Sequence, residues 1–400
     1  MTTTTAKEPA TALGYQLFDA DNHYYEAEDA FTRHIEKKYA KRAVGWATVD
    51  GKQKLLVGGK VNNFIPNPTF DPIGKPGVLA EFFKGKTSKN VSDLFGDLEP
   101  IRPEYRDRDA RLNVMDKQGV ERTWLFPTLG VGIEVALRHD VPACVAAFRA
   151  FNRWLEEDWG FAYEERIFAA PYITLLDLDA AIAELEWCLD HDARLICMLP
   201  APVERPGQSL SPFLEDFDPF WARVNESGIT VTFHGGDSGY NRFVGLWEPN
   251  DDFRAFFATP LQRVLMGSRP ISDTMAALMC HKLFERHPNI RVASIENGAG
   301  WSRSLLKKVD LAAAQTPGWF KERPSETFKR HVWISPFWEE NPANAAQYIG
   351  IDRTLFGSDW PHIEGIAEPA SYVDSLAELP DDAVRKVMRD NAIELTQRAA

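Results

Sequence analysis

Acidic residues and histidines that could bind a metal ion follow apolar runs at four separate places in the chain. Asp21 and His23 end the first run, His234 ends a second, and Glu296 and Asp359 end two more. Alternate side chains of a strand point to the same side, so Asp21 and His23 can bind one ion together. Two imidazoles with carboxylates are a ligand set for zinc, manganese or iron that leaves a position for water.

A metal ion in such a set would acidify its bound water, and Asp359 or Glu296 could accept the proton. These two carboxylates and His234 are therefore the predicted catalytic residues. Each residue alone also has an ordinary structural interpretation, because a histidine at a strand end is more often a core residue and aspartate favours turns. Their repeated position after successive apolar runs favours a shared site.

Neighbouring residues have two interpretations that the sequence leaves open. Glu26 either reaches the site or caps the next helix. His362 and Glu364 follow Asp359 and could orient a ligand or touch substrate. Trp360 and Trp301 are candidates for a substrate pocket, although tryptophan is more often a core residue.

Short apolar runs alternate with helical segments along the chain, and this order predicts where the candidate site residues lie in the fold. Eight candidate strands are Gln16–Asn22, Arg122–Pro127, Ile167–Ile173, Arg194–Leu199, Ile229–His234, Ile290–Glu296, His331–Ser335 and Thr354–Ser358. The expected helices are Ala136–Trp159, Leu178–His191, Phe213–Ser227, Asp273–His287, Trp301–Ala314 and Pro380–Arg398. This alternation predicts an α/β fold, a (β/α)8 TIM barrel, whose active site lies where strands end. An open doubly wound sheet is the competitor, but no G-x-G-x-x-G follows the first strand.

The domain organisation that we predict has one barrel with two irregular excursions. Residues 1–14 are expected to be a disordered tail, and residues 15–400 form the barrel. Residues 48–103 are rich in glycine and proline and predict an insertion with a small hairpin over the barrel mouth. Residues 235–265 are rich in aromatic residues and predict a lid-like loop or a subunit contact.

Composition excludes several classes of partner. A net charge of −13 argues against nucleic-acid binding, and no apolar run is long enough to span a membrane. The four cysteines are widely spaced, which predicts reduced thiols and a cytoplasmic protein. A small molecule is the expected substrate.

Several segments together resemble the amidohydrolase-related branch of the amidohydrolase superfamily, which contains decarboxylases of the aminocarboxymuconate-semialdehyde and resorcylate types. The matching segments are Asp19–Glu26, Arg111–Asp116 with Gly119, Phe126–Pro127, Phe233–His234, Phe284–Ile290, Glu296–Trp301 and Gly357–His362. The resemblance implies a (β/α)8 barrel and one or two divalent ions. It also implies that the metal ligands are Asp21, His23, His234 and Asp359. Relatives of this type and the aromatic excursions make a homodimer the expected assembly.

Two positions depart from the family pattern and bear on the reaction. Asp21 replaces the first histidine of the usual His-x-His pair, and Glu296 replaces the histidine of the sixth strand. A carboxylate beside a metal-bound water suits hydrolysis, or it can hold a second ion together with Glu26 or His362. The first prediction is therefore a metal-dependent hydrolase of small carboxylic amides, esters or thioesters. The alternatives are a non-oxidative decarboxylase of an aromatic or unsaturated acid and a metal-free interaction scaffold.

Overall fold

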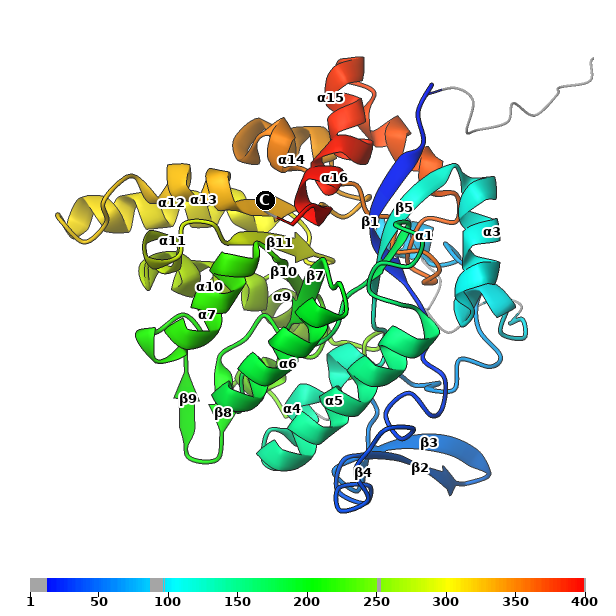
Figure 1. The fold of residues 1–400 in the computed structure, drawn as a ribbon. Coiled ribbons are helices and arrows are strands. Elements are labelled where there is room, and N and C mark those ends of the chain that lie inside the picture. Colours follow the sequence, from blue (N-terminus) through cyan, green and yellow to red (C-terminus); the bar gives the residue numbers. More distant parts are fainter. Residues whose placement is uncertain (1–12, 87–95, 97, 250–252, 399–400) are drawn as a thin grey trace, which may run out of the picture.

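Parallel strands form the centre of the molecule. The computed structural model describes residues 13–86, 96, 98–249 and 253–398. One parallel sheet has the order β1-β5-β6, and a second has the order β12-β11-β10-β7. The strands are β1 (Leu17–His23), β5 (Val120–Phe126), β6 (Ile167–Ala169), β7 (Leu195–Met198), β10 (Thr230–His234), β11 (Arg291–Ile295) and β12 (Val332–Ile334). Figure 1 shows helices packed around these strands.

Single bridges join the two sheets into a ring. Tyr172 bridges Cys197 on one side, and on the other side Thr354 bridges Ile334 while Trp360 bridges Asn22. All three bridges are parallel, so residues 354–360 occupy the eighth strand position. The barrel prediction is confirmed.

The predicted eighth strand, Thr354–Ser358, is wrong as a continuous strand. The amide of Phe356 donates to the Val387 carbonyl at 3.1 Å, and the amide of Ser358 donates to the Asp19 carboxylate at 2.9 Å. These two amides therefore do not hydrogen-bond to a neighbouring strand, although residues 354–360 still lie between β12 and β1.

Helices occupy the expected intervals, but several are shorter than predicted. Those around the barrel are α3 (Arg108–Gln118), α4 (Glu134–Leu137), α5 (Val141–Asp158), α6 (Leu178–Asp190), α7 (Asp218–Ser227), α10 (Arg269–Cys280), α11 (Leu283–Arg286), α12 (Gly300–Gln315), α13 (Pro324–His331), α14 (Pro342–Ile349), α15 (Asp381–Arg385) and α16 (Asn391–Thr396). One turn of π-helix, Lys386–Asp390, joins the last two. Short 3-10 helices are Pro103–Tyr105, Gly130–Gly132, Glu215–Phe217, Ile351–Arg353 and Pro369–Leu376.

Two predicted helices are broken for local reasons. Ala136–Trp159 divides into α4 and α5 because Asp140 caps a new helix start and Pro142 occupies its first turn. Asp273–His287 divides into α10 and α11 at Lys282, whose φ of +58° is left-handed.

The insertion after β1 begins earlier than the predicted boundary at residue 48. An antiparallel sheet of β2 (Val44–Val49), β3 (Lys52–Val57) and β4 (Lys60–Val61) opens it, and Val44 pairs with Val57. This sheet lies beside the barrel (Figure 1), and the chain then returns through α1 (Ala80–Phe83). The tail predicted at residues 1–14 falls almost wholly outside the described residues.

The second excursion contains α8 (Asn241–Val244) and α9 (Pro260–Met266), and it contacts the first. The amide of Ala255 donates to the Phe64 carbonyl at 3.1 Å, and the Phe64 and Phe253 rings lie 5.9 Å apart. An unpredicted hairpin, β8 (Val203–Arg205) with β9 (Gln208–Leu210), lies outside the barrel.

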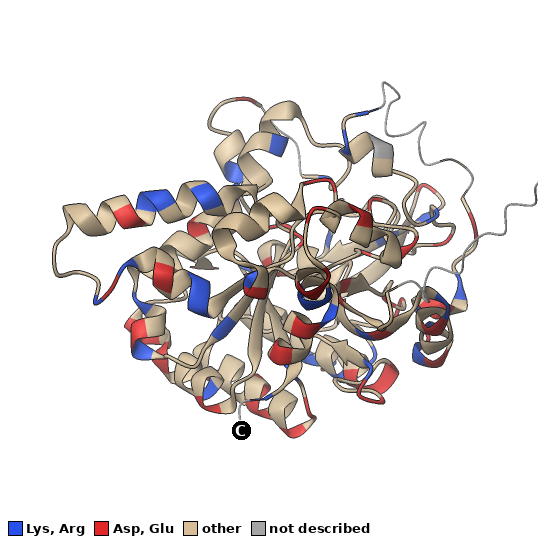
Figure 2. Ribbon diagram, turned by 90° about the horizontal axis from the view of Figure 1, so that it is seen from above, with Lys and Arg blue, Asp and Glu red and all other residues tan. Residues whose placement is uncertain are grey.

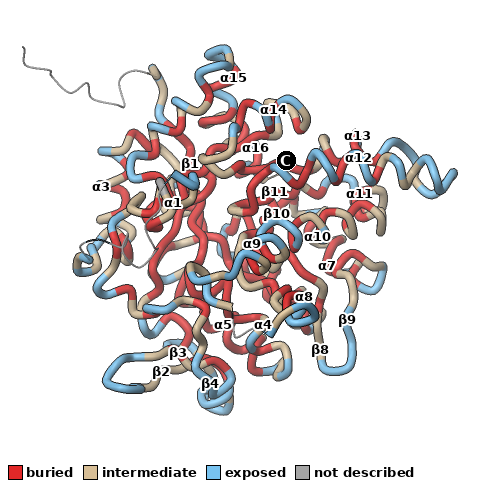
Figure 3. The backbone as a smooth tube through the Cα atoms, turned by 180° about the vertical axis from the view of Figure 1, so that it is seen from behind, coloured by how far each residue is buried: buried red, intermediate tan, exposed pale blue. Residues whose placement is uncertain are grey.

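Burial follows the barrel. Figure 3 shows buried residues concentrated along the central strands, while the tips of the two hairpins are exposed. Charged residues of both signs are spread over the outer helices (Figure 2). Among the described helices, none is long and apolar enough to cross a membrane.

Candidate functional site

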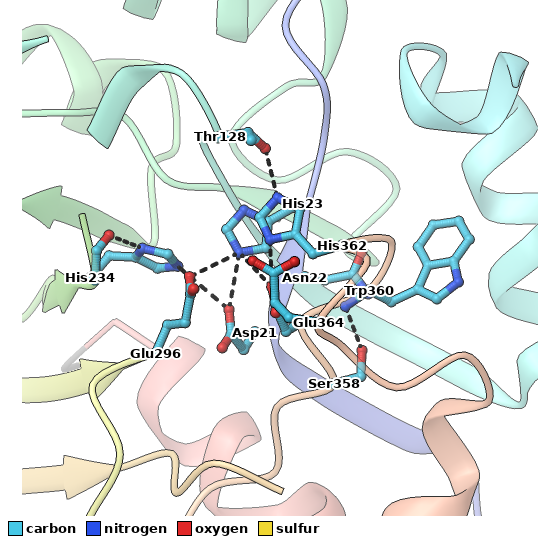
Figure 4. Close-up of polar contacts among 12 residues, drawn as sticks. Asp21, Asn22, His23, Thr128, His234, Glu296, Ser358, Trp360, His362 and Glu364 are labelled. Atoms are coloured by element: carbon cyan, nitrogen blue, oxygen red, sulfur yellow. Dashed lines mark hydrogen bonds and ion pairs between the residues drawn. The ribbon is translucent and has the colours of Figure 1, made fainter. Parts of the chain in front are cut away.

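Four side chains from three strands meet at the carboxyl ends of those strands (Figure 4). His23 Nε2 lies 3.4 Å from Asp21 Oδ1 and 3.6 Å from Glu296 Oε2. His234 Nε2 lies 3.5 Å from the same Asp21 oxygen and 3.3 Å from the same Glu296 oxygen. Their ligand atoms all lie within 4.8 Å of one another, so the structure brings together four of the residues that the sequence singled out.

The donor atoms of this cluster fit a metal ion. Asp21 Oδ1, His23 Nε2 and His234 Nε2 are buried and have no hydrogen-bond partner among the described residues. His234 Nδ1 donates to the Gly235 carbonyl at 2.8 Å, so its Nε2 presents a lone pair to the cluster. Ligands about 2.1 Å from one ion lie roughly 3.0–3.4 Å from their neighbours, which is close to the separations here.

Backbone geometry turns Glu296 toward the cluster. Strand β11 ends at Ile295, and Glu296 has a φ of +53°, in the left-handed region. Gly235 makes this turn feasible, because a Cβ at that position would lie 2.5 Å from the Glu296 carbonyl oxygen. Left-handed residues other than glycine cost about 1–3 kcal/mol and concentrate at functional sites.

Asp359 lies beside the cluster and is linked to His362. Asp359 Oδ1 is 3.3 Å from His23 Nε2 and 2.6 Å from His362 Nδ1. His362 Nε2 contacts the Thr128 hydroxyl at 3.0 Å, and its ring stacks on His23 with 3.9 Å between centroids. Asp359 and His362 also form a second group with His23 and Glu296 that could hold a metal ion.

Hydrogen bonding identifies which atoms of this chain carry protons. The Thr128 hydroxyl has one proton, and it donates to the Tyr24 carbonyl at 2.8 Å, which can only accept. His362 Nε2 must therefore donate to Thr128. Burial lowers the pKa of His362 well below its usual value, so the neutral ring leaves Nδ1 unprotonated. The proton between His362 and Asp359 then belongs to Asp359, whose pKa burial raises well above its usual value.

A second layer of buried residues that sequence reasoning did not single out supports the site. Asp19 accepts hydrogen bonds from the Ser358 amide and hydroxyl and from Asn22 Nδ2, and burial raises its pKa to about 6. Arg111 donates to Asn22 Oδ1 and to the carbonyls of His23 and Glu104. The apolar approach to Asp19 and the Arg111 segment were visible in the sequence, but neither pattern indicated a partner.

The remaining candidates have structural roles. Glu26 is buried, and its Oε1 accepts hydrogen bonds from the amides of residues 128–130 at 2.8–3.0 Å, so it caps a turn after β5. Trp360 packs against the Arg111 guanidinium, whose Cζ lies 4.6 Å from the centroid of the indole ring. Figure 4 shows the Trp360 indole directed away from the imidazoles. Trp301 donates to the Gly298 carbonyl. Neither tryptophan is among the residues that line the cavity, and their contact with substrate stays a prediction.

A cavity of about 650 Å³ opens above the cluster. Asp21, His23, His234, Glu296 and Asp359 all line it. Glu364 lines it as well, and burial and Glu296 raise the pKa of Glu364 to about 8. The Asp21 and Glu296 carboxyl groups and both imidazoles therefore face one opening, and these are ligand types that divalent cations accept.

Comparisons with known proteins identify relatives of this chain. The family model described as Amidohydrolase matches residues 79–396. The chain is 26% identical over 311 residues to gamma-resorcylate decarboxylase from Rhizobium sp. (strain MTP-10005), covering 71% of this chain and 85% of that protein.

Solved structures also resemble this chain. An amidohydrolase from Mycobacterium avium subsp. paratuberculosis K-10 has a TM-score of 0.92 at 42% identity, covering 96% of this chain and all of that chain. A dihydroxybenzoic acid decarboxylase from Polaromonas sp. JS666, crystallised with manganese and the inhibitor 2-nitroresorcinol, has a TM-score of 0.57 at 20% identity. That match covers 81% of this chain and 96% of the other, and it shows the fold.

Proposed function

This chain belongs to the amidohydrolase family and is an enzyme of that family, and we propose that it is a metal-dependent, non-oxidative decarboxylase of an aromatic or unsaturated carboxylic acid. The observation that carries this proposal is the hydrogen bond between Asp359 and His362 beside a four-residue cluster of possible metal ligands. The gamma-resorcylate decarboxylases that the chain resembles support the same reaction. The hydrolase predicted first is now the second candidate.

The cation would be held by Asp21, His23, His234 and Glu296. Two carboxylates and two neutral imidazoles match the charge of a divalent ion, and zinc, manganese and iron all accept such ligands. When bound, such an ion would supply Lewis-acid polarisation of the substrate carboxylate. This assignment makes Glu296 the fourth ligand in place of Asp359, which the family resemblance implied as a ligand.

Asp359 would then act as the proton donor. Its carboxyl group faces the cavity, and the hydrogen bond to His362 holds the proton in place. The bond between the ring carbon and the carboxylate breaks, carbon dioxide leaves, and the electron pair left on that carbon takes the Asp359 proton. Solvent returns a proton to Asp359, so protons and electrons balance.

The hydrolase candidate remains because of one observation. Glu296 brings a carboxylate into direct contact with both imidazoles, where a base would act on a water molecule. In that reaction Glu296 would accept the water proton, and one oxygen of the product acid would come from water.

Reactions in isotopically labelled water distinguish the two functions. With the manganese-loaded enzyme in D2O, decarboxylation of a hydroxylated aromatic acid is expected to release carbon dioxide and leave one deuterium on the ring carbon. Hydrolysis of an amide or ester in oxygen-18 water would instead label the product acid. Labelled product acid without carbon dioxide release from any aromatic acid would reject the decarboxylase.

Asp359→Asn is expected to keep the metal and lose at least about 100-fold in kcat, because positioned proton transfer contributes roughly 10²–10⁴-fold. Metal content and carbon dioxide release measure the two effects separately. Asp374→Asn, at an exposed position, is the matched control. Loss of the metal from the Asp359 variant would show that Asp359 is a ligand, as the family resemblance implies.

Metal removal is expected to lower Tm more at pH 8 than at pH 5. The pKa of Glu364 is raised from its usual 4.5 to about 8 in the folded protein. The contribution of Glu364 to the free energy of unfolding is therefore fully present below pH 4.5 and is lost as the pH rises to 8. A divalent ion offsets this loss and binds better once protons no longer compete. Thermal unfolding with and without chelator at both pH values measures the effect, and equal shifts would contradict it.

Two broader expectations belong to this proposal. We expect a homodimer, which light scattering on purified protein would test. We also expect a cytoplasmic location, because Cys144, Cys188, Cys197 and Cys280 are all free thiols and the first three are buried.

A further inference from the structure

The cavity above the ligand cluster is much larger than one aromatic ring. Its volume is about 650 Å³, whereas a cavity of roughly 150 Å³ is large enough to hold benzene. Cavities of about 300–1,000 Å³ typically enclose ligands of several rings. A single hydroxylated benzoate would leave most of this space without contacts.

The two insertions provide an apolar roof for the cavity. We use this name for the lining residues Phe64, Ile65, Phe70, Phe253, Phe256 and Phe257. The backbone hydrogen bond from Ala255 to Phe64 and the contact of the Phe64 and Phe253 rings join the two insertions. The histidines and carboxyl groups of the ligand cluster instead come from the strand ends. The insertions also contribute Asn67, Gln262 and Arg263, so the roof is mainly apolar and the metal-binding groups lie at the floor.

Charge in the cavity limits the substrate to one anionic group. Among the described lining residues Arg263 is the one lysine or arginine, while the acidic residues are Asp21, Glu296, Glu339, Asp359 and Glu364. Arg263 Nη2 donates to the Phe256 carbonyl at 3.4 Å, and its guanidinium lies 5.5 Å from the Phe82 ring, which leaves it as the one cationic side chain able to meet an anion here. Away from Arg263, a second carboxylate or a phosphate on the substrate would therefore meet acidic residues and aromatic rings.

We propose that the substrate is a monoanionic carboxylic acid whose apolar body is at least two fused rings in size. Its carboxylate lies at the ligand cluster and its apolar body lies under the roof. The position of the carboxylate rests on the proposed function, whereas the size and charge of the body rest on the cavity.

Calorimetric titration of the manganese-loaded protein tests the size of the substrate. The probes are salicylate and its naphthalene and anthracene homologues, with hydroxyl and carboxylate kept on adjacent carbons. Each added ring is expected to tighten Kd about tenfold through buried apolar area. A naphthalene homologue with a second carboxylate is expected to bind more weakly than the monoacid. Equal Kd values for salicylate and the naphthalene homologue, or no binding of the latter, would overturn the proposal.

Ala258→Trp tests where the apolar body lies. Ala258 lines the roof side of the cavity, so the larger side chain is expected to weaken the naphthalene homologue at least tenfold and to leave salicylate binding unchanged. Retained salicylate binding shows that the variant is folded. Ala314→Trp, at an exposed position of α12, is the matched control. Unchanged binding of the naphthalene homologue to Ala258→Trp would reject the placement.

Binding tests the proposed substrate class, and turnover tests the proposed decarboxylase, so either proposal can be rejected without the other. If the larger acids bind more tightly but no acid releases carbon dioxide, the decarboxylase is rejected and the substrate class stands. If salicylate is decarboxylated and the larger acids are excluded, the substrate class is rejected and the decarboxylase stands.

Discussion

The His234→Ala variant is expected to lose most of its metal and at least about 100-fold in activity. His234 Nε2 is one of the four proposed ligand atoms, and it lies 3.5 Å from Asp21 Oδ1 and 3.3 Å from Glu296 Oε2. Removing a residue that only supports a ligand already costs about 10–100-fold in affinity or activity, so removing the ligand itself costs at least that much. Metal content after dialysis and the Tm increase on adding manganese measure the loss.

His139→Ala is the matched control for this variant. His139 is exposed between α4 and α5, so its removal is expected to leave metal content and activity unchanged. If His234→Ala keeps its full metal content and its activity, the ligand assignment is wrong and the metal binds elsewhere.

Arg111→Met is expected to lower the free energy of unfolding by about 3 kcal/mol or more. Arg111 is fully buried, and its guanidinium donates to three acceptors on Asn22, His23 and Glu104. Methionine keeps much of the apolar stem but leaves these acceptors unpaired, at about 1–3 kcal/mol for each buried group. Urea unfolding monitored by circular dichroism measures the loss.

The same change is expected to weaken metal binding, because Arg111 holds the backbone of β1 next to His23. Lys117→Met, at an exposed position of the same helix, is the control and is expected to change stability by less than about 0.5 kcal/mol. A loss below about 1 kcal/mol for Arg111→Met would show that water or a neighbour satisfies the three acceptors.

Sequence patterns predicted the barrel because strand and helix periodicities are local. Apolar runs such as those ending at His23 and His234 specify both the strands and the face on which their last side chains lie. A predicted helix was divided where a single residue changed the backbone, as Lys282 does between α10 and α11. Such breaks are hard to predict, because most residue types adopt a left-handed conformation only when their surroundings require it.

Contacts between distant segments could not be predicted in the same way. Trp360 was a pocket candidate because it neighbours Asp359, yet the cation–π contact with Arg111 draws it into the protein interior. The two insertions were expected near the barrel mouth, but no sequence pattern showed that Phe64 would meet Phe253. These contacts depend on side chains that are far apart in the chain.

The fold and the chemical types of the candidate ligands could be predicted from the sequence, because both depend on short repeating patterns and on the residues that end each strand. The orientation of the individual carboxyl groups could not, because it depends on contacts between distant segments. Glu296 is turned inward by a left-handed backbone against Gly235, while Asp359 is held by His362 and, through it, by Thr128.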